Sequence, residues 1–99
     1  MTDHLHDLMN IALGGKIAYW YDPHHLVDGE RGNTPITELP DGYYTVTHNS
    51  DTEAWYHGPF GTEADVTEDF VWADCHDGLC VHVVSGVCLE ATPLESAYV

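Results

Sequence analysis

The sequence has almost no basic residues. Lys16 and Arg31 are its only lysine and arginine, beside 17 aspartates and glutamates, and the formal net charge is -15. A charge of this size and sign excludes direct binding to DNA, RNA or anionic membranes as a default, because all three are negatively charged. It favours cationic partners, and the most strongly cationic protein surfaces are those that hold nucleic acid.

Long apolar runs and an export signal are also missing from the sequence. No stretch approaches the roughly 18 apolar residues that a membrane-spanning helix needs. The N-terminal segment lacks a basic region followed by an apolar one, so no secretory signal is expected. The cysteines are odd in number, at Cys75, Cys80 and Cys88. We therefore expect reduced thiols and a cytoplasmic protein.

The common catalytic and cofactor-binding motifs are absent as well. The sequence has no G-x-S-x-G, P-loop, G-x-G-x-x-G or H-E-x-x-H pattern, and no stretch has the spacing of a calcium-binding loop. Carboxylates and histidines are numerous, but nothing in their spacing places a nucleophile beside a base. We expect neither enzyme activity nor a bound cofactor.

A cluster of Cys and His residues supports the main alternative, a small metal- or ligand-binding module. Zinc favours such ligands. Five lie close in sequence: Cys75, His76, Cys80, His82 and Cys88. In a strand over residues 79–84, Cys80 and His82 would point to one face. A two-residue turn then places Cys88 opposite Val83, on the other face. We therefore favour cysteines that pack in the core, and we predict no metal site.

The residues that are present indicate one folded domain spanning 1–99. The apolar fraction is 43% and aromatic residues contribute 11%, which suffices for a small core. Apolar residues at spacings of three and four predict a helix from a Thr2 cap to about Leu13. Aromatic and β-branched content predicts a strand over residues 16–21. The Pro-, Gly- and Asp-rich stretch 22–41 is expected to be a long loop with a short turn inside it.

The second half of the chain predicts a hairpin, a helix and another hairpin. Strands are expected over residues 42–48 and 52–58, before a breaker at "GPFG". Residues 62–74 read as a helix capped by Thr62, with Asp65 at the capping-box position and Val66, Phe70 and Ala73 as its apolar stripe. "LCVHVV" (79–84) and "VCLEA" (87–91) flank a Ser85-Gly86 turn. This order predicts an α+β domain: a mostly antiparallel sheet of about four to five strands, with two short helices packed on one face.

The acidic side of the helix at 62–74 is the candidate partner-binding surface. Its carboxylates lie opposite the apolar stripe, so Asp65, Glu68 and Asp69 are expected to face solvent together. Acids on the neighbouring loops extend the negative field. A folded chain of this size spans roughly 30–35 Å, a length over which duplex DNA carries on the order of 20 charges. The expected contact residues, in order of priority, are Asp65, Glu68, Asp69, Glu63, Asp74, Asp77, Asp51 and Glu53.

Four aromatic residues on the central hairpin, Tyr43, Tyr44, Trp55 and Tyr56, are a further candidate site. Rings on adjacent strands can stack nucleic acid bases, but a stacking platform needs a cationic surround that this chain lacks. Core packing and an exposed protein-contact patch are the two better interpretations. Exposed Trp or Tyr side chains beside the acids would act as anchors for a partner.

The stretches "MTDHLHDLMNIALGG" and "GTEADVTEDFVWADC", in a short, acidic, aromatic-rich chain without catalytic motifs, resemble phage-encoded anti-CRISPR proteins. Among these, the chain is most similar to acidic inhibitors of type I CRISPR-Cas surveillance complexes. The resemblance covers the character of the whole chain and carries over no single residue. It implies a non-enzymatic viral inhibitor in the host bacterial cytoplasm, a DNA mimic that binds a Cas subunit and blocks target DNA. An inhibitor of another nucleic-acid-binding protein, such as a restriction enzyme, is the alternative.

Overall fold

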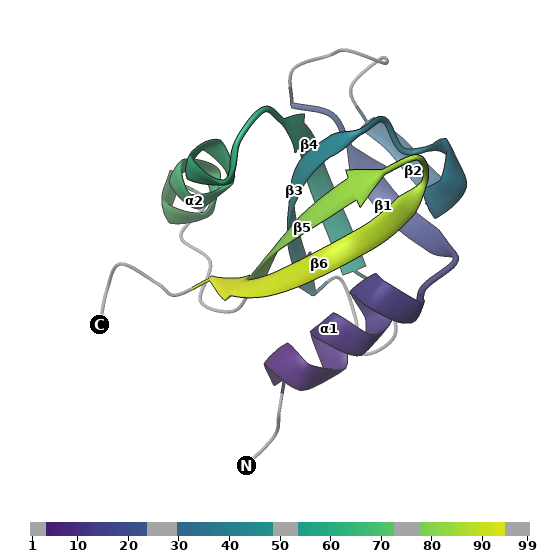
Figure 1. The fold of residues 1–99 in the computed structure, drawn as a ribbon, viewed down its shortest axis with the longest axis horizontal. Coiled ribbons are helices and arrows are strands. Elements are labelled where there is room, and N and C mark those ends of the chain that lie inside the picture. Colours follow the sequence, from purple (N-terminus) through teal and green to yellow (C-terminus); the bar gives the residue numbers. More distant parts are fainter. Residues whose placement is uncertain (1–3, 24–29, 49–53, 73–77, 95–99) are drawn as a thin grey trace.

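The computed structural model describes residues 4–23, 30–48, 54–72 and 78–94. These ranges form two α-helices, one 3-10 helix (η1) and six strands (Figure 1). In chain order they are α1 (His4–Gly14), β1 (Ile17–Tyr21), β2 (Glu30–Pro35), η1 (Ile36–Glu38), β3 (Gly42–His48), β4 (Ala54–Phe60), α2 (Glu63–Trp72), β5 (Gly78–Val84) and β6 (Val87–Leu94).

The strands form a single sheet in the order β2-β1-β4-β3-β5-β6. Every neighbouring pair is antiparallel except β1 and β4, which run parallel. The predicted α+β class with a mostly antiparallel sheet is therefore confirmed, with one strand more than the upper end of the expected count. Neither α-helix in the described ranges is long and apolar enough to cross a membrane.

The additional strand is β2, in a stretch where the sequence predicts a loop. It pairs antiparallel with β1, from Ile17 opposite Pro35 to Tyr21 opposite Glu30, across a register shift. Gly32 has a φ of 69° near this irregularity, a conformation that glycine adopts without a steric penalty. β2 lies at the edge of the sheet, where a proline that cannot donate a hydrogen bond is tolerated. Pairing with β1 therefore outweighs the weak strand propensity of these residues.

The two α-helices cover opposite faces of the sheet, whereas the sequence predicts both on one face. Figure 1 shows α1 below the strands and α2 apart from it at the upper left. Alternate residues of β5 show the division. Leu79 and Val81 belong to the core cluster that includes Leu8 of α1, whereas a side chain added at Gly78 would meet Phe70 of α2. We call these the α1 face and the α2 face.

The main hydrophobic core lies on the α1 face. Its rings also make buried hydrogen bonds: Trp20 Nε1 donates to the Gly58 carbonyl at 3.1 Å, and the Tyr56 hydroxyl donates to the Ala12 carbonyl at 3.2 Å. The first bond joins β1 to β4 and the second joins β4 to α1. The buried members of this core are Leu8, Ala12, Ala18, Trp20, Ile36, Leu39, Tyr44, Val46, Ala54, Tyr56, Leu79, Val81 and Val83.

The hairpins follow the predictions closely in the second half of the chain. β3 has the predicted bounds, and β4 continues through the expected breaker to Phe60, with a cis Gly58-Pro59 bond. Ser85 and Gly86 form the predicted turn with φ values of 51° and 76°, the positive pair that a type I′ turn requires. β6 runs on to Leu94, three residues beyond the expected strand end.

Candidate functional site

α2 begins where the sequence predicts. The Asp65 backbone N–H donates to Thr62 Oγ1 at 3.1 Å, so the threonine caps the helix. Glu63 and Asp65 lie in the first turn, where negative charge interacts favourably with the helix dipole. Val66 and Phe70 are fully buried on the α2 face. The helix is therefore fixed by its cap and by two apolar side chains, and its remaining positions are free to carry acids.

The acids of α2 differ in exposure. Glu63, Asp65 and Glu68 are exposed, as expected. Asp69 is not, because its side chain is only 24% exposed. The expectation that Asp65, Glu68 and Asp69 face solvent together is therefore correct for two of the three. Asp69 lies one residue before the buried Phe70, at the border between the apolar stripe and solvent.

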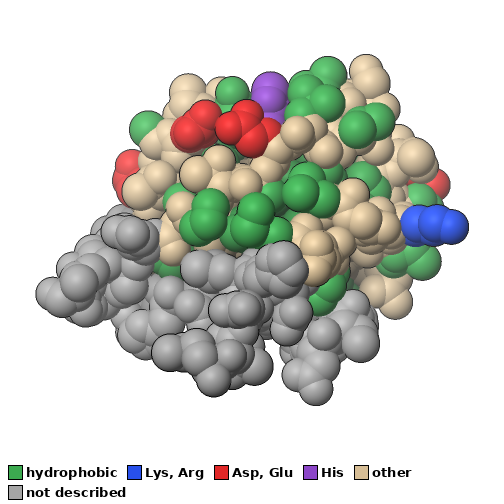
Figure 2. Space-filling model, turned by 60° about the horizontal axis from the view of Figure 1, so that its bottom comes forward, with side chains coloured by type: hydrophobic (Ala, Val, Ile, Leu, Met, Phe, Trp, Pro, Cys, Tyr) green, Lys and Arg blue, Asp and Glu red, His purple; other side chains and the backbone are tan. Residues whose placement is uncertain are grey.

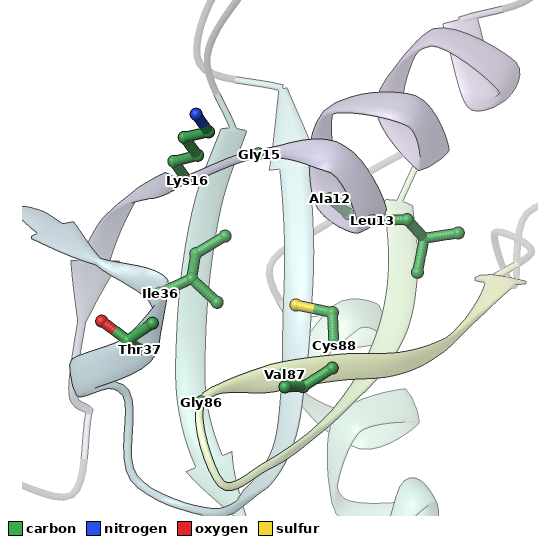
Figure 3. Close-up of a pocket in the computed structure, with 9 residues that line it drawn as sticks. All are labelled: Ala12, Leu13, Gly15, Lys16, Ile36, Thr37, Gly86, Val87 and Cys88. Carbon is green, nitrogen blue, oxygen red and sulfur yellow. The ribbon is translucent and has the colours of Figure 1, made fainter.

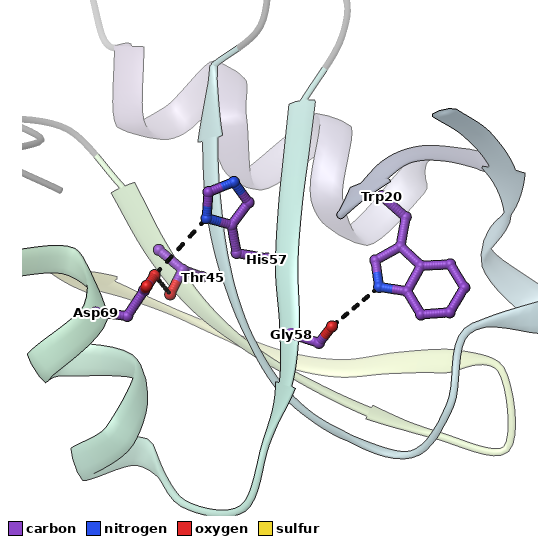
Figure 4. Close-up of polar contacts among 5 residues, drawn as sticks. All are labelled: Trp20, Thr45, His57, Gly58 and Asp69. Atoms are coloured by element: carbon purple, nitrogen blue, oxygen red, sulfur yellow. Dashed lines mark hydrogen bonds and ion pairs between the residues drawn. The ribbon is translucent and has the colours of Figure 1, made fainter. Parts of the chain in front are cut away.

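Asp69 is held by two side chains of the sheet (Figure 4). Thr45 Oγ1 on β3 donates a hydrogen bond to Asp69 Oδ2 at 2.9 Å. His57 Nδ1 on β4 lies 3.8 Å from the same oxygen, within ion-pair distance when the imidazole is protonated. Asp69 thus attaches α2 to two central strands, so it has a structural role beside any contact that it makes with a partner.

The carboxylates of Asp65, Glu68 and Asp69 nevertheless line one hollow beside α2. It has a volume of about 340 Å³ and opens between the helix and the end of β4. Its lining residues are Phe60, Gly61, Asp65, Glu68 and Asp69. We call this the acidic hollow. A cation placed there would meet carboxylates from successive turns of one helix.

The other predicted contact residues cannot be placed on this surface. Asp51 and Glu53 precede β4, and Asp74 and Asp77 lie between α2 and β5. All four lie outside the described residues. Ala73, the last expected member of the apolar stripe, lies there too. The candidate site therefore consists of Glu63, which is exposed outside the hollow, and the residues of the acidic hollow.

Sequence reasoning missed a row of rings on the α2 face. Tyr19 and Tyr21 of β1 lie in register with Trp55 and His57 of β4. The Tyr19 and Trp55 ring centroids are 3.8 Å apart, and those of Tyr21 and His57 are 5.4 Å apart. All four residues are half-buried. We call them the aromatic row. Alternating residues in "AYWY" were the available signal, but the sequence does not reveal that β1 pairs with β4.

The four hairpin aromatics divide between the faces. Tyr44 and Tyr56 are buried on the α1 face, with ring centroids 6.1 Å apart. Tyr43 and Trp55 lie half-buried on the α2 face, and Tyr43 stacks on His82 with 4.2 Å between centroids. The core-packing interpretation is therefore confirmed for Tyr44 and Tyr56. Tyr43 and Trp55 present part of their surface, and their use as a protein-contact patch stays a prediction.

The cysteines behave as packing residues in the described ranges. Cys88 lies opposite Val83, as predicted, and away from the face of Cys80. Burial raises the pKa of the Cys80 thiol to about 11, with further contributions from the negative charges of Glu63 and Glu90. Burial likewise raises the pKa of Cys88. Among the residues that the structure describes, no group of three or more His, Cys, Asp or Glu side chains is arranged to hold a metal ion.

An apolar groove forms a hollow that is separate from the acidic hollow (Figure 3). It has a volume of about 420 Å³ between the end of α1, η1 and the β5–β6 turn. Figure 2, in which the bottom of the view in Figure 1 comes forward, shows hydrophobic side chains in the middle of the face, acidic side chains above them and a basic side chain at the right edge. Leu13 and Val87 line the groove and are 48% and 54% exposed. The full lining is Ala12, Leu13, Gly15, Lys16, Ile36, Thr37, Gly86, Val87 and Cys88.

The chain has no recognisable relative in three comparisons. No protein-family model, curated protein or solved structure matches it.

Proposed function

We propose that this protein is a non-enzymatic inhibitor that binds the cationic surface of a nucleic-acid-binding protein and keeps nucleic acid away from it. The observation that carries the proposal is the charge density. A formal net charge of -15 is held on a body that measures 35 × 24 × 21 Å. A surface evolved to hold DNA would attract this protein through the same long-range electrostatic forces.

The magnitudes support imitation of nucleic acid. Duplex DNA carries one negative charge per about 1.7 Å, so a 35 Å length carries roughly 20 charges. The protein places a net 15 negative charges on the same length. A cationic groove that pairs with the phosphates of DNA would therefore meet a comparable number of negative charges on this protein.

The acids of α2 are the proposed centre of contact. Glu63, Asp65 and Glu68 are exposed on a helix whose cap and buried stripe hold it in place. The backbone that carries these carboxylates is already ordered, so its conformational freedom is not lost on binding and more of the interaction free energy is available for affinity. Asp69 contributes charge at the wall of the acidic hollow.

The finer identity of the target rests on resemblance. The acidic, motif-free character shared with anti-CRISPR proteins makes a Cas subunit of a type I surveillance complex the proposed target, in the cytoplasm of a bacterial host. A restriction enzyme or another DNA-binding protein is the alternative target of the same mechanism. The same competition experiment tests either target: the protein competes with labelled target DNA for the purified Cas complex or for the purified restriction enzyme.

The test compares two double variants of equal charge. Asp65→Lys with Glu68→Lys alters the acidic hollow, whereas Glu38→Lys with Glu90→Lys alters exposed acids elsewhere. Each exchange raises the net charge by two, so both variants carry the same total. We expect the first variant to lose at least tenfold in inhibition and the second to lose much less. Asp69 is left intact because it attaches α2 to the sheet.

Salt dependence provides a second readout. Affinity should fall steeply as ionic strength rises, because the proposed attraction is between surface charges. Equal losses in the two double variants would show that total charge matters and α2 does not. Affinity that stays flat with salt, or full inhibition by both variants, would overturn the proposal.

A small-ligand-binding module is the second candidate function, and the apolar groove favours it. The groove is within the volume range of small-molecule sites and is lined largely by apolar side chains, with the Cys88 thiol among them. Metal analysis of protein purified without an affinity tag addresses the related metal-binding alternative. Stoichiometric zinc whose removal unfolds the chain would replace the inhibitor proposal with that alternative.

A further inference from the structure

The α2 face combines aromatic rings and carboxylates in adjacent positions. The aromatic row crosses β1 and β4 through two ring pairs, Tyr19 with Trp55 and Tyr21 with His57. His57, at the end of the second pair, is 36% exposed and lies 3.8 Å from Asp69. Asp69 in turn lines the acidic hollow with Asp65 and Glu68. Half-buried rings and carboxylates thus form one continuous surface.

Charge complementarity restricts the occupant of this surface. Nucleic acid bases can stack on such rings, but their phosphates would be repelled by a chain of net charge -15. A second copy of the chain would bring the same negative charge. A cationic side chain is attracted to the face of an aromatic ring and to a carboxylate at the same time.

The arginine side chain satisfies both features of the surface better than lysine. Its guanidinium is planar, so it stacks flat on Tyr or Trp while its N–H groups pair with a carboxylate. The ammonium of lysine is a compact, strongly hydrated point charge that gains less from a ring. We propose that the aromatic row and the acidic hollow form a docking surface for arginine side chains of a basic protein segment. This inference rests on the proposed function and names the chemistry of its partner.

Two synthetic peptides of equal length and charge, octa-arginine and octa-lysine, test the inference by titration calorimetry at fixed ionic strength. We expect the wild-type protein to bind octa-arginine roughly three- to thirtyfold more tightly, the range that a cation–π contact supplies. Trp55→Leu removes a ring face but keeps an apolar side chain. It should abolish the preference by weakening octa-arginine binding, with little change for octa-lysine.

Tyr43→Leu is the matched control. Tyr43 is also half-buried on the α2 face, but it stacks on His82 of β5 and lies outside the aromatic row. The variant should keep the preference for arginine. Circular dichroism and urea unfolding of both variants verify that each binds as a folded protein.

The outcomes separate the inference from the proposed function. If neither peptide binds the wild-type protein, capture of a cationic partner fails and both proposals fall. If both peptides bind equally, or Trp55→Leu weakens both alike, the arginine preference is overturned while the proposed function stands. Direct binding of a single-stranded oligonucleotide to the protein in the absence of peptide, or concentration-dependent dimerisation, either of them blocked by Trp55→Leu, would assign the aromatic row to another occupant and overturn the inference.

Discussion

The two faces of the sheet use similar residues for different purposes. On the α1 face, Tyr44 and Tyr56 are buried, and their hydroxyls donate to backbone carbonyls at Pro40 and Ala12. On the α2 face, their sequence neighbours Tyr43 and Trp55 are half-buried: Tyr43 stacks on His82, and Trp55 is tilted against Tyr19. Adjacent aromatic residues on one strand thus contribute to stability on one side and to an accessible surface on the other.

The faces also differ in how their helices are attached. α1 packs on the main core through Leu8 and Ala12, which are fully buried. α2 buries Val66 and Phe70 but is also tied to the sheet through Asp69, Thr45 and His57. A polar attachment leaves neighbouring acids near the sheet rather than far out in solvent. On the α2 face, this attachment places the Asp69 carboxylate within 3.8 Å of the ring of His57, which belongs to the aromatic row.

The largest expected contrast is between two adjacent tyrosines. Tyr44→Ala should destabilise the protein by about 3–5 kcal/mol, since it leaves a cavity in the core and removes the hydrogen bond to Pro40. Tyr43→Ala should cost about 1 kcal/mol, because its side chain is only half-buried. Urea unfolding of both variants measures the difference. Equal losses in the free energy of unfolding would contradict the view that the α1 face contributes more to stability than the α2 face.

High pH should destabilise the protein through buried tyrosines and thiols on both faces of the sheet. Burial raises the pKa values of Tyr44, Tyr56, Cys80 and Cys88 in the folded state, that of Cys80 to about 11 from 9.0. The unfolded chain therefore binds fewer protons above pH 9, so stability is full below that pH and declines as pH rises. The thiol of Cys80 contributes between about pH 9 and 11.

Urea midpoints measured from pH 7 to 11 test this decline. Tyr44→Phe removes one of the four titrating groups, so its stability should fall less steeply with pH than that of the wild type. A wild-type midpoint that is constant from pH 8 to 11 would contradict the prediction.

The polar attachment of α2 should be worth less than a core ring. Thr45→Val keeps the shape of the side chain but removes the donor to Asp69, so we expect a loss of about 1.5 kcal/mol. Thr47→Val, two residues further on the same strand and face, is the control for removing a threonine hydroxyl. Hydrogen exchange of the α2 amides should accelerate in the first variant only. If both variants lost the same stability, the hydrogen bond between Thr45 and Asp69 would not contribute to holding α2 on the sheet.

The smallest predicted effect concerns the start of α2. Thr62→Ala removes the side-chain acceptor for the Asp65 N–H and should cost about 1 kcal/mol. Thr62→Asp should restore most of this stability, because aspartate is also a good cap. Urea unfolding of the wild type and both variants measures these effects. An unaffected Thr62→Ala variant would show that the packing of Val66 holds the start of the helix without the side-chain cap.

The elements with local signals could be predicted from the sequence. Thr62 marks the start of α2, and Ser85-Gly86 marks a turn between alternating strands. The predicted bounds of β3 agree with those in the structure, because the segment has a high content of β-branched and aromatic residues. In these cases the residues that determine the structure are neighbours in the chain.

The features that depend on distant residues could not be predicted. β2 is a strand because it pairs with β1, and its own composition of Gly, Asn and Pro favours a loop. Helical periodicity gives the direction of Asp69 around α2, but not that Thr45 from β3 lies beside it. The aromatic row likewise exists only because β1 and β4 pair. Each of these is a tertiary contact without a local signature.

The parallel pairing of β1 with β4 has a consequence for folding kinetics. The chain consists of three hairpin-like pairs, β1–β2, β3–β4 and β5–β6, and each can form from residues close in sequence. Joining the first pair to the second brings together Trp20 and Tyr56, which requires closure of a long loop. The pairing of β3 with β5, from Gly42 opposite Val83 to Val46 opposite Leu79, closes a loop of similar length. We therefore expect the joining of the three pairs to limit the folding rate, so that substitutions at these two seams slow folding more than substitutions within any single hairpin.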